Sequence, residues 1–584
     1  MSVELARLAL TDDAARRPLF WRGEATVADG GLRLAPGATL DLGTWFNAAP
    51  VAWWRDVLGP GHVRLVVQGS GRLRLWTTAH GQARVEQTVD LDGTWEARIP
   101  RTDDAGWAWL DVTDDGSGTA HVRSVSWTAQ RPPAAVVTEA DARAQRVTVV
   151  VPTYGREDDA LEQVERLLAP GLDGVVGRVV LVDQARTVRG APRFDQVRDA
   201  SGDRLVLVEQ DNLGGSGGYT RGMLESLAFP GDAVLLLDDD AQIEPETLRR
   251  LLVLAGCAAV PTIMGTALLS AEAPTQVEAV AEGVRPRGFV WGPSDGLRSA
   301  VDLAGSTPDA WTFADPAART DYTGWWGTLL PAGAVERLGL SVPYFLKWDD
   351  AEYGLRARRE GFAVRTLPGT GTWHPTWAAK GTISSWSAWP LHRNRLATAA
   401  AYGADRSVLR DSLVHQVKHV LSLQYDTADQ WDAALAQLLD GPGWLTSDLR
   451  TVRGRAQALL DAAPHGPDVD GSSARDVTAE APRPAVAAAL RAVVGLVTRP
   501  SGRDAVRVEP ARFTWRTGLG RDVVELGGRT VVRDPERARA ALARTVRLHA
   551  RAARAWRALQ REYGTALPAS RATQVWQGTI QGDD

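Results

Sequence analysis

Four short segments between residues 146 and 240 are mainly apolar and alternate with amphipathic stretches, and this alternation limits the fold more than any other feature. Strands that are apolar on both faces and separated by helices are typical of a sheet covered by helices. We therefore predict an α/β domain over residues 136–400, with functional side chains at the carboxyl ends of its strands. The predicted strands are Val147–Val151, Arg178–Asp183, Arg204–Glu209 and Ala233–Leu237, and the predicted helices are Asp158–Leu168 and Tyr219–Leu227.

The N-terminal region, residues 1–135, has the pattern of a β-domain. Its strand-like segments are short and are separated by glycine-containing turns, and Asp92-Gly93 is a typical hairpin signal. Short strands at this spacing favour a β-sandwich or barrel. The predicted strands are Val63–Val67, Arg72–Trp76, Ala83–Val89 and Trp95–Ile99, and Pro132-Pro133 is predicted to begin a linker.

The C-terminal region, residues 401–584, is rich in Ala, Leu and Arg and is predicted to be helical. The polar, proline-containing segment 464–484 is predicted to be a mobile loop. Eight arginines within Glu536–Tyr563 are explained either by a solvated helix face or by contact with anionic lipid headgroups or a neighbouring subunit. The predicted helices include Val408–Leu423, Trp431–Leu439 and Glu536–Tyr563.

The composition excludes several classes of protein. A formal net charge of −5 does not indicate a nucleic-acid-binding protein, and the single cysteine, Cys257, excludes an internal disulfide framework. The sequence has neither a secretory signal nor an apolar run of about 18 residues, so we expect a cytoplasmic protein that can lie against a membrane. The 23 tryptophans, against 8 tyrosines and 9 phenylalanines, are explained either by sugar stacking or by a tryptophan-rich core.

Three carboxylates, Asp238, Asp239 and Asp240, directly follow the apolar segment Leu235-Leu236-Leu237. Such crowding is repulsive and is tolerated when a divalent cation lies among the oxygens. Alternation along an extended chain places Asp238 and Asp240 on one side and Asp239 on the other. A metal ion held there can neutralise the diphosphate of a nucleotide, whereas the alternative is a solvated acidic turn that caps the next helix.

Two further motifs carry groups suited to the same chemistry. His374 can supply a third ligand for Mn²⁺ or Mg²⁺, although a histidine before proline is more often structural. Asp349, Asp350 and Glu352 lie within four residues, and one of them can act as the base that deprotonates an acceptor hydroxyl. The alternative is that these acids only stabilise the N-terminus of a helix.

A glycine-rich segment, Asn212–Gly218, lies between the third and fourth predicted strands. Its four glycines let the backbone approach a ligand closely and present N–H groups to it. The segment has neither the Gly-Lys-Ser/Thr of a Walker loop nor a GxGxxG dinucleotide fingerprint. By itself it predicts only a turn that comes close to a ligand.

Taken together, these motifs resemble family 2 glycosyltransferases of the GT-A fold. Val151–Arg156 (VPTYGR) resembles their opening strand. The order of Pro-Thr, Asn-Leu-Gly-Gly, Asp-Asp-Asp, Trp-Asp-Asp and Trp-His is similar to that of the polymerising galactofuranosyltransferases of mycobacterial cell-wall galactan synthesis. Trp45–Pro50 and Trp53-Trp54 resemble the β-domain of that family, and the similarity continues from Trp325-Trp326 to His392–Leu396.

The resemblance implies roles for individual residues. It implies that Asp238, Asp240 and His374 hold Mn²⁺ or Mg²⁺. It also implies that Asp350 is the catalytic base, with Asp349 as a competitor for that role. The implied donor-binding residues are Pro152, Thr153, Arg156, Asp183, Gln184, Asn212, Asp238 and Asp239, and the implied acceptor-binding residues are Trp325, Trp326, Trp348 and Asp349.

The implied activity is an inverting, metal-dependent transfer of galactofuranose from UDP-galactofuranose to a lipid-linked galactan acceptor. The resemblance also implies a homotetramer on the inner face of the plasma membrane. Two alternatives stay open: a family 2 transferase with another donor, such as a UDP-hexopyranose or dTDP-rhamnose, and a noncatalytic glycan-binding scaffold of the same fold. A nucleotidyltransferase also uses paired acids and a metal, but its glycine-rich loop with a basic residue near the first strand is absent.

Overall fold

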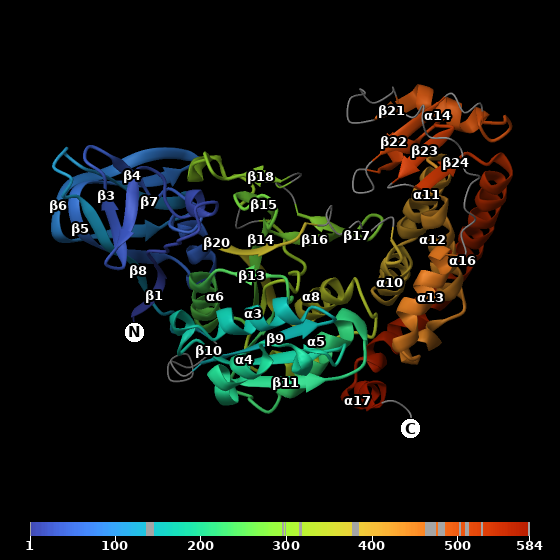
Figure 1. Ribbon diagram of the computed structural model, residues 1–584, viewed down its shortest axis with the longest axis horizontal. Helices are drawn as coiled ribbons and strands as arrows, with labels where there is room; N and C mark the ends of the chain where they lie inside the picture. Colours follow the sequence, from blue (N-terminus) through green and yellow to red (C-terminus); the bar gives the residue numbers. More distant parts are fainter. Residues whose placement is uncertain are drawn as a thin grey trace.

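The computed structural model places a β-domain, an α/β domain and a helical region side by side along its long axis (Figure 1). This order follows the chain, except that the last helix, α17 (Thr573–Gln581), returns to the central domain. There the buried Trp576 donates a hydrogen bond from Nε1 to Ser341 O (2.8 Å). The structure describes residues 2–135, 145–294, 297, 300–314, 318–376, 385–461, 475–476, 485–500, 504–508, 513–526 and 529–581.

Two long strands dominate the N-terminal domain, where the sequence pattern predicted four short ones. β5 (Gly61–Ala79) and β6 (Gln82–Arg101) form one antiparallel hairpin, and His80 and Gly81 make its turn. The predicted hairpin turn at Asp92-Gly93 is wrong, because both residues lie inside β6. Gly93 has a φ of 91° and pairs with Gly69 of β5. These glycines therefore bend the long strands and do not end them.

The other strands extend this hairpin into an eight-stranded sheet. The first half of β5 pairs with β8 and its second half pairs with β7, which explains the bend between the halves. The sheet order is β2-β3-β8-β5-β7-β4, with β1 beside β8 and β6 beside β5, so the N-terminal region is built mainly of strands as predicted. The remaining elements are β1 (Ser2–Arg7), β2 (Ala25–Ala28), β3 (Gly31–Leu34), β4 (Thr39–Asp41), α1 (Val51–Leu58), β7 (Ala105–Thr113) and β8 (His121–Gln130).

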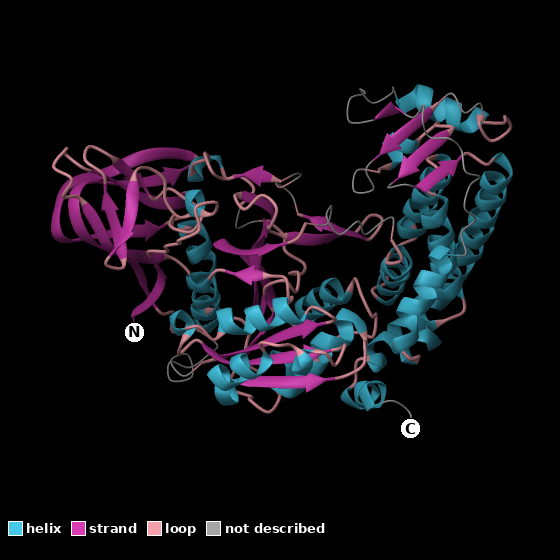
Figure 2. Ribbon diagram, viewed as in Figure 1, coloured by secondary structure: helices cyan, strands magenta, loops and turns pink. Residues whose placement is uncertain are grey.

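The central domain is built on a mixed sheet with helices packed against it (Figure 2). The order β11-β10-β9-β12 is parallel throughout, and β19 then runs antiparallel to β12 and β14. The predicted GT-A-like α/β fold is confirmed, and all four predicted strands are present. The strands are β9 (Val147–Thr153), β10 (Val176–Asp183), β11 (Leu205–Glu209), β12 (Ala233–Leu236), β13 (Gln242–Ile243), β14 (Thr262–Ser270), β15 (Gln276–Ala279), β18 (Val301–Asp302), β19 (Thr328–Leu330) and β20 (Ala363–His374), with β16 (Glu282–Arg285) and β17 (Val290–Pro293) as a separate pair.

Helix α5 (Gly214–Ser226) begins inside the glycine-rich segment, where the sequence pattern predicted a turn. A Cβ on Gly218 would lie 2.6 Å from Pro152 Cβ. A Cβ on Gly222 would lie 2.0 Å from Val150 Cγ1. The glycines therefore let α5 lie close against β9, and this packing outweighs their low helix propensity. The other helices of this domain are α3 (Glu157–Leu167), α4 (Phe194–Ser201), α6 (Pro245–Cys257), α7 (Ala334–Leu338) and α8 (Asp349–Arg359).

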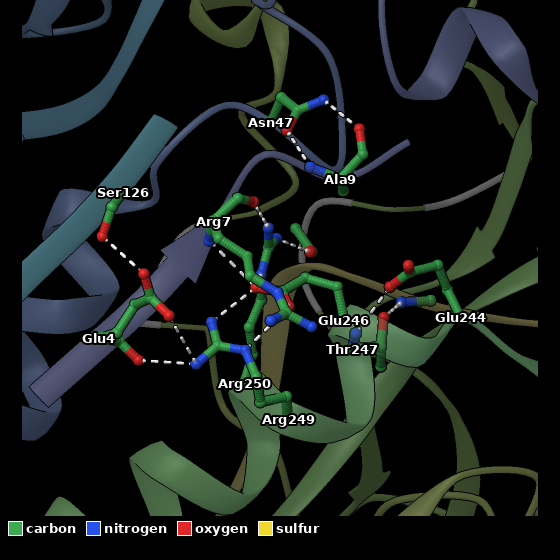
Figure 3. Close-up of polar contacts among 12 residues, drawn as sticks. Glu4, Arg7, Ala9, Asn47, Ser126, Glu244, Glu246, Thr247, Arg249 and Arg250 are labelled. Atoms are coloured by element: carbon green, nitrogen blue, oxygen red, sulfur yellow. Dashed lines mark hydrogen bonds and ion pairs between the residues drawn. The ribbon is translucent and has the colours of Figure 1, made fainter. Parts of the chain in front are cut away.

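A buried carboxylate on α6 joins the central domain to the N-terminal domain (Figure 3). Glu246 accepts hydrogen bonds from Arg7 Nε on β1 (2.9 Å) and from Arg249 Nη2 (2.6 Å). Arg250 Nε lies 3.3 Å from the same carboxylate. Although burial raises the pKa of Glu246, the neighbouring arginines lower it to about 2. The ionised form of this carboxylate is therefore part of the domain interface.

The C-terminal region contains long helices and a small sheet that the sequence pattern did not predict. β22 pairs in parallel with β21 and β23, and β24 runs antiparallel to β23. Segment 464–484 lies outside the described residues apart from β21, and no described helix combines the length and apolar character needed to cross a membrane. The elements are α10 (Ala388–Ala401), α11 (Ser407–Leu421), α12 (Tyr425–Leu439), α13 (Arg450–Asp461), β21 (Arg475–Asp476), α14 (Ala485–Val494), β22 (Ala505–Val508), α15 (Trp515–Gly518), β23 (Val523–Leu526), β24 (Arg529–Val532) and α16 (Pro535–Ser570).

Candidate active site

Asp238, Asp240 and His374 lie together at one edge of the central sheet. His374 Nε2 lies 3.2 Å from Asp238 Oδ2 and 3.3 Å from Asp240 Oδ1. One ligand atom from each residue can be chosen so that all three lie within 4.8 Å of one another. Two carboxylates and an imidazole at this separation are a donor set that fits Mn²⁺, while Mg²⁺ prefers an all-oxygen shell.

Strand pairing brings these three residues together from distant parts of the chain. The two acids follow β12, whose four residues are all buried. Soon after them, β13 pairs with β20, with Gln242 opposite Trp373. His374 is the last residue of β20, and this pairing therefore places its ring beside the acids.

Asp239 points to a different set of partners. It accepts a hydrogen bond from Thr153 Oγ1 (2.7 Å) at the end of β9. Arg156 Nη1 lies 3.5 Å from Asp239 Oδ1 and 2.8 Å from Asp240 Oδ2. Burial raises the pKa of Asp239 to about 6. Although burial opposes it, the hydrogen bond to Asp240 and the charge of Asp239 raise the pKa of Arg156, which therefore stays charged beside the acids.

The two adjacent acids of α8 differ in their surroundings. Asp349 is 8% exposed and accepts a hydrogen bond from Ser216 Oγ of α5 (2.9 Å). Asp350 lies half-buried, and its Oδ1 accepts a hydrogen bond from the backbone N–H of Ala351 (2.7 Å). Burial and the charge of Asp349 raise the pKa of Asp350 to about 7. Burial raises the pKa of Asp349 as well, but the hydrogen bond from Ser216 occupies that carboxylate, so Asp350 is the acid better placed to exchange a proton.

The segment before α8 has an unusual backbone that α10 supports. Phe345, Lys347 and Trp348 all have positive φ angles, of 70°, 72° and 73°. Asn394 Nδ2, on α10, donates hydrogen bonds to Leu346 O and Lys347 O (2.9 Å each). This buried amide therefore stabilises the conformation from which α8, with both acids, begins.

A cavity of about 430 Å³ connects these groups. It is lined by Asp238, Asp240 and His374, which we call the metal-site triad, and by Arg156, Asp239, Asp349 and Asp350. The predicted acceptor residues Trp325, Trp326 and Trp348 lie in its wall, together with Trp291, Tyr322 and Trp386. Other tryptophans, such as Trp45, Trp54, Trp389 and Trp556, are fully buried, so a tryptophan-rich core explains part of the content, and sugar stacking stays a prediction.

Several cavity residues were not singled out by the sequence analysis, and Glu282 and Tyr219 are the two with contacts to the site that matter most. Glu282, at the start of β16, accepts a hydrogen bond from Tyr322 OH (3.0 Å), and burial and the charge of Asp350 raise its pKa to about 8. Tyr219 OH lies 2.6 Å from Asp238 Oδ1. A lone acid in the apolar segment Val280–Val284 was a usable signal for Glu282. No comparable signal existed for Tyr219.

Five of the predicted donor-binding residues do not line the cavity: Pro152, Thr153, Asp183, Gln184 and Asn212. The carboxylate of Asp183 accepts hydrogen bonds from three backbone N–H groups of the loop after β10. Gln184 Oε1 accepts from Gln210 Nε2 (3.1 Å) and Leu213 N (3.0 Å). Asn212 Oδ1 accepts from Gly214 N (3.0 Å), and Pro152 lies under α5. These side chains shape the loops beside the cavity, and their donor-binding roles stay predictions.

Two family models match the chain. Residues 144–395 match the model described as glycosyltransferase like family 2, and residues 23–130 match the model described as galactofuranosyltransferase 2 N-terminal. Galactofuranosyltransferase GlfT2 of Mycolicibacterium smegmatis is 30% identical over 595 residues, covering 94% of this chain and 90% of the relative. Galactofuranosyltransferase GlfT2 of Mycobacterium tuberculosis is 32% identical over 461 residues, covering 74% and 70%.

The solved structures that align with the chain are more distant. TarS of S. aureus (residues 1–349) aligns with a TM-score of 0.31 at 15% identity, covering 54% of this chain and 88% of that one. The mannosyltransferase PcManGT from Pyrobaculum calidifontis, in complex with GDP-Man and Mn²⁺, aligns with a TM-score of 0.30 at 18% identity, covering 56% and 89%.

Proposed function

The chain belongs to the GlfT2 galactofuranosyltransferases within glycosyltransferase family 2, and from this premise we propose that it transfers galactofuranose from UDP-galactofuranose to a galactan acceptor with inversion. The observation that carries the proposal is that the metal-site triad and Asp350 line the same cavity. A transferase needs both groups within reach of one anomeric carbon. Asp350 is the proposed catalytic base.

The donor side of the cavity is suited to a diphosphate. Asp238, Asp240 and His374 would hold Mn²⁺ or Mg²⁺, which when bound supplies positive charge to the leaving nucleotide. Arg156 lines the same cavity and contributes a permanent charge of the same sign. The hydrogen bond between Thr153 and Asp239 holds the acid that pairs with Arg156, so the guanidinium keeps its position.

The acceptor side supplies the base. Asp350 accepts the proton of the acceptor hydroxyl while that hydroxyl attacks the anomeric carbon. Ser216 holds Asp349 by a hydrogen bond, which leaves Asp350 as the proposed proton acceptor of the two. In this single displacement no enzyme nucleophile forms a bond to the sugar, and an α-linked donor therefore yields a β-linked product.

The aromatic wall is suited to bind a sugar chain. The proposed acceptor residues Trp325, Trp326 and Trp348 line the cavity but are at most 9% exposed, so only a small part of each ring can contact the C–H face of a furanose. Binding of sugars beyond the reacting one would then position the terminal hydroxyl next to Asp350.

The test is an assay with purified protein, UDP-galactofuranose, Mn²⁺ or Mg²⁺ and a synthetic galactofuranosyl disaccharide. Mass spectrometry is expected to show products extended by hexose units, and NMR of the product is expected to show the β-anomer. UDP-galactopyranose, UDP-glucose and dTDP-rhamnose serve as donor controls, and faster transfer from any of them would refute the proposed donor. Full turnover in thoroughly chelated buffer would refute the proposed metal dependence.

A scaffold of the same fold would give a different result. A noncatalytic scaffold would bind the acceptor without turnover, and Asp350→Asn would not change that binding. In an enzyme, Asp350→Asn would keep acceptor binding but lose turnover. The homotetramer and the contact with the inner membrane face stay predictions. Light scattering after size-exclusion chromatography tests the first, and sedimentation with anionic vesicles tests the second.

A further inference from the structure

A second pocket, with a basic lining, lies in the N-terminal domain. Its volume is about 480 Å³, and the start of β5, the end of β6 and the end of β8 contribute to its wall. Arg64, Arg98, Arg101 and Arg131 line it, and no carboxylate is found among the described residues that do so. We call it the Arg101 pocket.

Arg101 is the most unusual of these residues. It is only 5% exposed, yet its Nε and Nη1 have no hydrogen-bond partner. Its Nη2 lies 3.5 Å from Pro60 O. Burial lowers the pKa of Arg101, and no carboxylate in the described part of the chain opposes this effect. A buried cation without a counter-charge is costly, and an anion in the adjoining pocket would remove that cost.

The backbone opposite Arg101 leaves space for its guanidinium. Gly61 pairs with Arg101 across the β5–β6 hairpin and has a φ of 147°. A Cβ at this position would lie 2.7 Å from Arg101 Nη2. A glycine is therefore needed for the guanidinium to keep its present place beside the pocket.

The Arg101 pocket also contacts the central domain. Arg131 Nη2 donates a hydrogen bond to Gly256 O (3.0 Å), close to the C-terminal end of α6. The N-terminal end of the same helix follows the acidic triplet and β13. The 13 residues of α6 span about 20 Å, so the pocket and the metal site are separate places joined by one rigid helix.

We propose that the Arg101 pocket binds a phosphate group carried by a larger molecule, with Arg101 as its principal ligand. Guanidinium groups match phosphate oxygens in geometry as well as in charge. A pocket of about 480 Å³ is much larger than a single ion, which points to a phosphate monoester or diester. The molecule can be soluble, or the phosphate can belong to a lipid headgroup. This binding is independent of the proposed sugar transfer.

Pyrophosphate titration in metal-free buffer tests the proposal. We expect the Tm of the full-length protein to rise to a plateau with pyrophosphate, but not with sodium chloride at equal ionic strength. Arg101→Gln is expected to weaken binding by about tenfold or more, since it removes hydrogen bonds to a charged ligand. Arg123→Gln, an exposed arginine of β8 outside the pocket, is the matched control and should bind as the wild type does. The same titrations are repeated in a protein that also carries Arg156→Gln. This second substitution weakens pyrophosphate binding in the catalytic cavity, so the remaining binding can be assigned to the Arg101 pocket.

Vesicles of phosphatidylcholine, with and without phosphatidic acid, form the second arm. Arg101-dependent binding of pyrophosphate supports a soluble ligand, and Arg101-dependent binding seen only with phosphatidic acid supports a lipid phosphate. If wild type and Arg101→Gln behave alike in both arms, the proposal is refuted. Circular dichroism checks the folding of the variant. Arg98→Gln, on an exposed pocket residue, is the second variant if Arg101→Gln does not fold, and it should weaken the same binding severalfold.

Discussion

Replacing Asp350 by asparagine should abolish most activity and stabilise the protein at the same time. The amide keeps the shape of the carboxyl group but cannot accept the proton of an attacking hydroxyl. General-base catalysis contributes about 100- to 10,000-fold, so kcat/KM is expected to fall by a factor in that range. The wild-type kcat/KM should rise with pH and level off above about 7, where Asp350 is ionised. In Asp350→Asn this dependence should disappear.

The stability gain follows from the direction of the same pKa shift. Burial and Asp349 raise the pKa of Asp350 from 3.8 to about 7 in the folded protein. Because the folded pKa is the higher one, the protonated form favours folding below pH 3.8, and this advantage is lost as the pH rises through 7. One pKa unit corresponds to about 1.4 kcal/mol, so above pH 7 the ionised Asp350 costs at most about 4 kcal/mol. Asparagine removes this cost.

Urea unfolding at pH 4 and pH 8 in metal-free buffer measures this difference. Asp350→Asn should be more stable than the wild type at pH 8 and nearly equal to it at pH 4. Glu360→Gln, at the exposed residue that caps the C-terminus of the same helix, is the control and should change neither quantity. An active Asp350→Asn variant would exclude Asp350 as the base. An inactive variant that is also less stable at pH 8 would indicate a structural role and refute the reasoning above.

Four further predictions concern the metal site, the domain interface and the support of the cavity. His374→Ala should lower Mn²⁺ affinity, measured by calorimetry, by at least about 100-fold. It removes a proposed direct ligand, and the loss of a residue that only supports a ligand already lowers affinity by about 10- to 100-fold. Glu246→Gln should lower the free energy of unfolding by about 3 kcal/mol at pH 7, and this loss should shrink as the pH falls from 4.5 towards 2, because the pKa of Glu246 is depressed to about 2 in the folded state. Asn394→Ala should lower kcat about tenfold or more without changing the calorimetric Kd of UDP, because it loosens the backbone before α8. Gly222→Ala should lower the free energy of unfolding by about 1–3 kcal/mol in urea titrations, because its Cβ would overlap Val150.

Periodicity identified four strands of the central sheet because they are continuous apolar runs, which can be recognised in the sequence without knowing their partners. The same reasoning failed for β5 and β6, since glycines that bend a strand look identical in sequence to glycines that end one. It also failed for α5, where close packing on β9 is possible only because Gly218 and Gly222 have no side chain. That advantage appears only once the neighbouring strand is in place.

The residues of the active site were likewise predicted only in part. Local sequence identified the acidic triplet and the paired acids of α8, because crowded carboxylates are unusual wherever they occur. It did not establish that His374 joins the triplet, since the pairing of β13 with β20 is a long-range contact. It could not separate Asp349 from Asp350 either, because the difference depends on Ser216, which lies 133 positions earlier in the chain.

Helix α10, at the end of the predicted α/β domain, supports the active site through contacts that the sequence pattern does not reveal. Three residues before α8, Phe345, Lys347 and Trp348, adopt left-handed backbone conformations that cost about 1–3 kcal/mol each in a residue with a side chain. Asn394 and the buried Arg393 of α10 bind the carbonyl groups of this segment and offset that cost. Helix α10 in turn packs against α12 and α16. Substitutions in the core between these helices are therefore expected to alter the orientation of Asp350, and so turnover, before they unfold the central domain.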